Sequence, residues 1–151
     1  MKKFNFSLKS VGIVREAREL RLREAFSVAL RAVVEAEQAL ARIRREQAEF
    51  ERGMMAERMQ AFRPADQVAF LHAHQLLLVR ERGAIADLEK TVVERELRRT
   101  EWLGSRRDLR LIEKLEQTAR HEYRLEEDRE NQRLLDDRAP SGAGRGFGAA
   151  A

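Results

Sequence analysis

The side chains that could carry chemistry in this sequence are few, and their spacing does not suit catalysis or metal binding. His72 and His74 are two residues apart, so on a helix they would point to nearly opposite sides and could not chelate one metal ion. His121 has no histidine or acidic residue three or four positions away, and no serine lies in a nucleophile-elbow context. The absence of cysteine excludes disulfides, thiolate metal sites and a thiol nucleophile. The sequence therefore predicts a protein that is not an enzyme, with no catalytic residue, cofactor or metal site.

An arginine-rich stretch indicates a different kind of chemistry, the binding of negatively charged groups. Residues 95–110 contain six arginines and three acidic residues. Such a cluster can neutralise phosphates without a pocket. However, the acidic residues interrupt it, Trp102 is the only residue there that could stack on a base, and no known DNA-binding motif is present. We therefore expect no nucleic-acid partner, and an acidic protein surface as the target of Arg95, Arg98, Arg99, Arg106, Arg107 and Arg110.

The elements that must position these side chains are helical. Charged residues make up 37% of the chain and aromatic residues 6%, which leaves too few bulky apolar side chains for a wide core but enough for a narrow seam between helices. The 30 basic and 26 acidic residues are interleaved, as is typical of solvated helix faces. This composition favours a coiled coil over a globular domain.

The stretch from Ala61 to Asp66 is the one clear interruption in this helical sequence. Pro64 fits poorly inside a helix but well in the first turn of a new one, and Asp66 would meet the positive end of that helix. We predict an all-α fold in which two long helices, about 8–60 and 66–138, form an antiparallel coiled-coil hairpin with a turn at about 61–66. This hairpin would be a single domain over residues 1–138, and residues 139–151 a disordered tail. The alternative is a proline kink in one continuous helix.

Apolar residues in steps of four and three predict the seam between the helices. In the second helix, Leu71, Leu78, Ile85 and Val92 recur every seven residues, with Leu88 between them, and predict the stripe that faces the first helix. Phe70, Leu76 and Leu77 then remain as a candidate docking surface near the bend, and changes of phase after Val92 predict stutters and an uncertain register. In the first helix the seam is predicted at Leu22, Phe26, Ala29, Val33, Ala36, Leu40, Ile43, Gln47, Phe50 and Met54, with Gln47 as a polar residue that sets register.

The two ends of the chain carry further expectations. Phe4 and Phe6 either dock on a partner or pack on the free end of the second helix. That helix is longer than the first, so its end should project as a single exposed helix. The projecting end is acidic, because residues 113–137 contain nine acidic and five basic residues. No stretch is long and apolar enough for a membrane span, and the N-terminus is too polar for a signal peptide, so we expect a cytosolic protein.

Three stretches of the sequence resemble one protein family. They are the opening Phe4-x-Phe6-x-Leu8, the middle Ala36-Glu37-Gln38-Ala39-Leu40, and the closing Glu122-Tyr123-Arg124 followed by Gln132 and Asp136. Together they look like the flagellar export protein FliJ family, and the resemblance covers nearly the whole chain. It implies a cytoplasmic stalk, peripheral to the inner membrane through its partners. Those partners would be the hexameric export ATPase, whose assembly and activity the stalk promotes, the cytoplasmic domain of the export gate, and export chaperones.

The resemblance also implies partner-binding residues. Gate contact in the family falls on the middle of the first helix and the start of the second, which here carry Glu46 and His74 where the family often has aromatic residues. We expect ring-facing charges at the arginines and in the acidic run near Glu126. The alternatives are a structural coiled-coil tether and the equivalent stalk of a virulence-type secretion system. The predicted partner-binding residues are Ile43, Phe50, His74 and Leu78 for the gate, and Arg95, Arg98, Arg99, Arg106, Arg107 and Glu126 for the ATPase.

Overall fold

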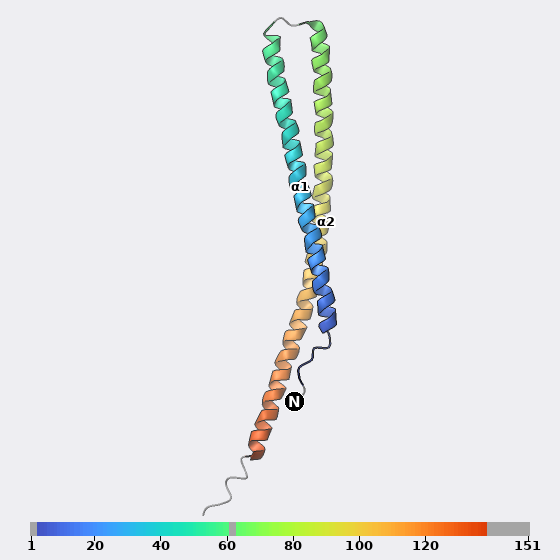
Figure 1. Ribbon diagram of the computed structural model, residues 1–151. Coiled ribbons are helices and arrows are strands. Elements are labelled where there is room, and N and C mark those ends of the chain that lie inside the picture. The colour runs from blue at the N-terminus through green and yellow to red at the C-terminus, as the bar shows by residue number, and fades with distance from the viewer. Residues whose placement is uncertain (1–2, 61–62, 139–151) are drawn as a thin grey trace, which may run out of the picture. The chain divides into compact units, whose positions relative to one another are not determined.

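The computed structural model describes residues 3–60 and 63–138, and these form two helices (Figure 1). Helix α1 runs over Lys9–Arg58 and α2 over Pro64–Arg138, and the described residues contain no strand. The all-α helical hairpin predicted from the sequence is confirmed, and the single kinked helix is excluded because the helix stops at Arg58. The predicted disordered tail at 139–151 and turn residues 61 and 62 lie outside the described residues.

The start of α2 follows from its sequence. Pro64 is the first helical residue, where its missing N–H costs no hydrogen bond, and Asp66 lies in the first turn. The backbone N–H of Asp66 donates to the carbonyl oxygen of Arg63 at 3.0 Å. A carboxylate at this point is stabilised by the unpaired N–H groups of the helix start.

The contacts group the chain into two units, which are described separately. The bend unit is Arg18–Ser105, and the terminal unit is Met1–Ala17 with Arg106–Ala151. In the bend unit, α1 and α2 lie side by side and run in opposite directions (Figure 1). All ten α1 residues predicted for the seam, from Leu22 to Met54, are buried or half-buried there, so that prediction is confirmed.

The seam of α2 in the bend unit differs from the prediction. Leu71 and Leu78 are 53% and 36% exposed, whereas Phe70 and Leu77 are half-buried and face α1. Ile85 and Val92 of the predicted stripe are half-buried, as predicted. From Phe70 to Ser105, buried and half-buried residues of α2 also recur in an alternation of four and three that continues past Val92, so the predicted stutters are wrong in this unit. These seam positions are Phe70, His74, Leu77, Glu81, Ala84, Leu88, Thr91, Arg95, Arg98, Trp102 and Ser105.

The α2 seam is regular because polar residues occupy positions that a search for apolar residues passes over. Gln47 Nε2 donates to the Leu77 carbonyl at 3.3 Å, and the Trp102 indole N–H donates to Glu19 Oε1 at 2.8 Å. The Trp102 ring also stacks on Phe26 with 5.4 Å between centroids. Directional bonds of this kind disfavour a shift of one helix along the other, which is the register-setting role predicted for Gln47.

The terminal unit is built from the first residues of the chain and the second half of α2. Phe4 meets Tyr123 edge-on at 5.5 Å between centroids, and the Arg120 guanidinium lies 5.3 Å from the Phe4 ring. Of the two alternatives for the N-terminal aromatics, Phe4 therefore packs on α2. Further along, Gly12 lies against Ile112, where an added Cβ would stand 3.3 Å from the isoleucine Cγ2. Glycine therefore leaves room for the isoleucine side chain against α1.

Beyond Tyr123, α2 continues to Arg138 without a neighbouring helix in the terminal unit, as expected for the longer helix. Its described residues after Tyr123 are exposed, apart from the half-buried Glu127. Leu115 is also exposed. Before it, Leu109 and Ile112 are half-buried and buried.

Candidate functional site

Three of the predicted gate-binding residues, Ile43, Phe50 and His74, lie within the hairpin seam. Ile43 and Phe50 are half-buried on α1. The Phe50 ring contacts Phe70 at 6.0 Å and His74 at 6.3 Å between centroids, and His74 Nε2 lies 3.3 Å from Glu51 Oε1. The structure therefore brings Phe50 and His74 together near the bend, where they hold the two helices against each other.

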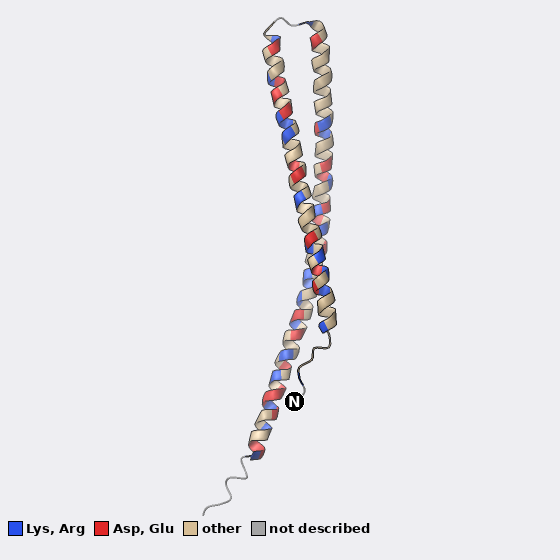
Figure 2. Cartoon of the chain, viewed as in Figure 1, with Lys and Arg blue, Asp and Glu red and all other residues tan. Residues whose placement is uncertain are grey.

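Leu78 differs from these residues because it lies outside the seam. It is exposed, and Leu71 one heptad before it is more exposed still. Residues 67–79 of α2 contain no Lys, Arg, Asp or Glu, so Figure 2 shows this part of the helix as an uninterrupted tan stretch. Of the predicted docking surface, Leu76 is exposed, whereas Phe70 and Leu77 belong to the seam, so the docking surface that α2 offers near the bend is Val68, Leu71, Leu76, Leu78 and Val79.

A polar network crosses the seam next to this surface. Arg44 Nε donates to Glu81 Oε1 at 2.9 Å, and Gln47 Nε2 donates to Glu81 Oε2 at 3.2 Å. On the neighbouring turn, Arg80 pairs with Glu46 at 2.8 Å. The hydrogen bond from Arg44, followed by that from Gln47, lowers the pKa of Glu81 below its usual value of 4.5. The charged form of Glu81 is therefore the one that binds α1 to α2.

Acid should weaken this network. Because the folded-state pKa of Glu81 is lowered, the carboxylate stabilises the hairpin above its unfolded pKa, and this contribution is lost as pH falls through the folded pKa. We expect the free energy of unfolding of the wild type to fall more steeply below about pH 4.5 than that of Glu81→Gln. Urea titrations between pH 3 and pH 7 measure the difference. Glu49→Gln, at an exposed position of α1, is the matched control and should follow the wild type.

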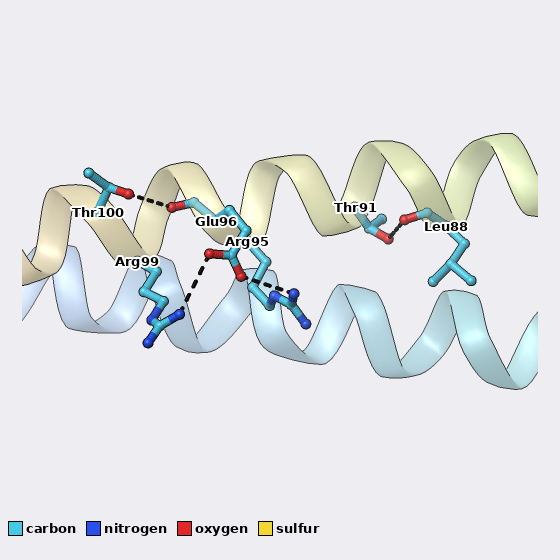
Figure 3. Close-up of polar contacts among 6 residues, drawn as sticks. All are labelled: Leu88, Thr91, Arg95, Glu96, Arg99 and Thr100. Carbon is cyan, nitrogen blue, oxygen red and sulfur yellow. Dashed lines mark hydrogen bonds and ion pairs between the residues drawn. The ribbon is translucent and has the colours of Figure 1, made fainter.

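The arginines predicted to face the ATPase fall into two groups. In the bend unit, Arg95 and Arg98 occupy half-buried seam positions, and Arg99 is exposed. All three pair with glutamates of their own helix. The Glu96 carboxylate forms ion pairs with Arg95 at 3.0 Å and with Arg99 at 3.7 Å. Figure 3 shows these two contacts.

Arg98 is bound from both sides on the same helix. Glu94 accepts from Arg98 at 2.7 Å and Glu101 at 3.1 Å, and these bonds raise the pKa of the guanidinium. These three arginines, Arg95, Arg98 and Arg99, already form ion pairs with glutamates of α2. They are therefore poor candidates for a separate contact with a partner.

In the terminal unit, Arg106 is half-buried, Arg107 is exposed, and Arg110 is exposed one turn further on. Glu126 is exposed on the part of α2 that continues past Tyr123. The accessible charges of the terminal unit therefore include Arg107, Arg110 and the acidic residues around Glu126. Sequence reasoning grouped all the arginines together because it could not see which of them occupy the seam.

Two further properties limit the chemistry that the described residues can perform. No group of three or more His, Asp or Glu side chains among them is arranged to hold a metal ion. Neither helix, over its described length, has an apolar run that could cross a lipid bilayer. What the described surface offers is an exposed apolar patch near the bend and exposed charges in the terminal unit.

Comparison with known proteins gives one match. The family model described as "Flagellar FliJ protein" matches residues 4–146, which is nearly the whole chain. Neither the curated proteins nor the solved structures gave a match. The matched residues include both helices and both units described above.

Proposed function

Because the chain belongs to the flagellar FliJ protein family, it is a non-catalytic component of the flagellar export apparatus, and we propose that it acts as the stalk and escort of that apparatus. The terminal unit inserts into the ring of the hexameric export ATPase and promotes its assembly and activity. The bend region contacts the cytoplasmic domain of the export gate, and the protein also serves export chaperones. It works in the cytoplasm and reaches the inner membrane through these partners. The family match over residues 4–146 is the observation that carries this proposal.

The terminal unit supports the contact with the ring. Past Tyr123, α2 continues as a helix that offers charges of both signs on an exposed surface. Exposed ion pairs are individually weak, typically about 0–1 kcal/mol, so such a surface favours many exchangeable contacts over one tight socket. A stalk that meets the unlike subunits of a ring in turn needs contacts of this kind.

The bend unit supports the contact with the gate. Leu71 and Leu78 are exposed beside Leu76 and Val79 on a stretch of α2 without charged residues. Exposed apolar clusters of this kind are common at protein interaction sites. Phe50 and His74 contribute indirectly, since their ring contact fixes how α2 is presented beside α1.

The rate of ATP hydrolysis by the cognate export ATPase tests the proposal. We expect the purified protein to raise this rate at low ATPase concentration, where ring assembly limits activity, and the effect to saturate near one copy per hexamer. Circular dichroism of the same preparation verifies that the protein is helical. A folded, helical protein that leaves the ATPase rate unchanged would contradict the stalk function and favour a tether.

A further inference from the structure

The side of α2 that faces away from α1 in the bend unit is almost free of charge. Its residues follow the same alternation of three and four as the seam, displaced around the helix. All are exposed, and Lys90 is the charged member. The outward face of a two-helix hairpin is normally its most polar one. We call this set the back row: Ala69, His72, Leu76, Val79, Gly83, Ala86, Lys90, Val93, Leu97 and Thr100.

The back row has an apolar pair of residues on each side of a central segment that includes the small residues Gly83 and Ala86. Leu76 and Val79 lie on one side and Val93 and Leu97 on the other, each of them at least half exposed. Between the two apolar pairs lie Gly83, Ala86 and Lys90. A Cβ added at Gly83 would meet nothing within 4 Å, so the centre of the row is open to a close approach by another helix. The spacing of the row is that of a coiled-coil seam without its second helix.

The charges that flank the back row are polarised along α2. Arg80 and Arg82 lie on its two sides near the bend, and Asp87 and Glu89 lie on the same two sides one heptad further on. Arg82, Asp87 and Glu89 are exposed and make no ion pair with the described residues, whereas Arg80 pairs with Glu46. A helix that runs antiparallel to α2 with the same charge order would place acid beside base on both sides.

We propose that the back row binds the back row of a second copy of this chain, with the two α2 helices antiparallel. In the register that places Gly83 opposite Ala86 of the second copy, Leu76 meets Val93. The same register brings Arg82 beside Glu89 and Arg80 beside Asp87, and twofold symmetry repeats each pair. The α1/α2 pair shows the same spacing between a seam contact and the ion pair that flanks it. There, Gln47 contacts Leu77 in the seam, and Glu46 pairs with Arg80 beside it.

Other arrangements of two copies fit the charges less well. In parallel helices in register, Arg82 would lie beside Asp87 of the second copy, but Glu89 would lie beside Glu94, which repel. The proposed interface leaves Leu71 and Leu78 exposed, because neither belongs to the back row, but it covers Leu76 and Val79 of the docking surface near the bend. Self-association and the proposed contact with the gate would therefore compete for Leu76 and Val79.

Sedimentation equilibrium of the full chain tests the proposal through a charge swap. The wild type should move from 17.5 kDa towards twice that mass as its concentration rises. Arg82→Glu and Glu89→Arg should each weaken the dimer by about tenfold or more, since each turns two attractive contacts into repulsions. An equimolar mixture of the two variants should regain dimers, because each variant supplies the charge that the other has lost.

Arg42→Glu, an exposed reversal on α1, is the matched control and should dimerise like the wild type. A monomer at every concentration would overturn the proposal. So would dimers that both reversals leave unchanged, or a mixture that dimerises no better than the single variants.

Cysteine cross-linking gives a second measurement that does not depend on the charges. The chain has no native cysteine, so Gly83→Cys and Ala86→Cys place single thiols at the centre of the proposed interface. Under mild oxidation, a mixture of these two variants should form a disulfide-linked dimer with unchanged helix content. The control is Ala41→Cys, exposed on α1. Equal cross-linking of the control and the mixture would count against the back row as the interface.

Discussion

Substitution of Val33 by aspartate should lower the free energy of unfolding of this protein by about 3 to 5 kcal/mol. Val33 is 4% exposed, at one of the best-covered positions of the seam. The introduced carboxylate would be buried among apolar groups without a partner, and the contacts of the valine side chain would be lost. Urea unfolding followed by circular dichroism measures the loss. Trp102, the only tryptophan, reports on the same unit by fluorescence because it stacks on Phe26.

The neighbouring residue provides the control. Val34 is 49% exposed, so Val34→Asp makes the same chemical change one residue away on the solvent side of α1. Its effect should stay within about 0.5 kcal/mol, as is usual for surface substitutions. Equal destabilisation by the two variants would show that α1 does not present Val33 to α2, and the assigned seam would be wrong.

Reversal of Arg107 and Arg110 to glutamate should remove most of the stimulation of the export ATPase, a decrease of about fivefold or more. Both side chains are exposed in the terminal unit. The proposed stalk function brings this unit into the ring, where the new carboxylates would repel an acidic surface. The ATPase rate at low enzyme concentration is the measurement, and circular dichroism verifies that the double variant is folded.

The control for this experiment carries the same change of charge at the same spacing. Arg42→Glu with Arg45→Glu reverses two exposed arginines of α1 in the bend unit and should leave the stimulation near the wild-type level. If both double variants lower the stimulation equally, net charge rather than the terminal unit is responsible. Arg98→Glu would be a poor test, because Arg98 occupies the seam and its reversal faces Glu94 and Glu101.

The fold was predictable because its determinants are local. Pro64 and Asp66 mark the start of α2, and the steps of four and three from Leu22 to Met54 specify the side of α1 that is covered. Apolar residues fill most of these α1 positions, so a search for apolar periodicity finds the seam directly. The resemblance to the FliJ family likewise depended on residues that can be read in order along the chain, and the family match bears it out.

The seam of α2 was not predictable by the same means. Glu81, Arg95 and Arg98 occupy seam positions there, while Leu71 and Leu78 form an apolar row outside the seam. Periodicity alone cannot tell which of two apolar stripes faces the neighbouring helix. The choice depends on bonds such as that between Gln47 and the Leu77 carbonyl, which exist only once α1 is in place.

The candidate site was predictable only in part for the same reason. Charge counts identified the arginines, but accessibility depends on the register of the hairpin. Arg95 and Arg98 are half-buried in the seam, whereas Arg107 and Glu126 are exposed. The partner-binding roles of Ile43, Phe50, His74, Leu78 and the arginines stay predictions until the variants are measured.

The antiparallel pairing of the bend unit also bears on how it folds. Near the bend, the contact of His74 with Glu51 joins residues 23 apart in sequence, whereas that of Trp102 with Glu19 joins residues 83 apart. Loop-closure entropy grows only logarithmically, so direct formation of the distant contact costs about 1 kcal/mol more than formation of the near one. Once the near contacts exist, each further turn closes only a short loop. The bend unit should therefore fold from the contact of Phe50 with Phe70 towards Trp102. The helix turns around Trp102 should be the first to exchange their amide hydrogens.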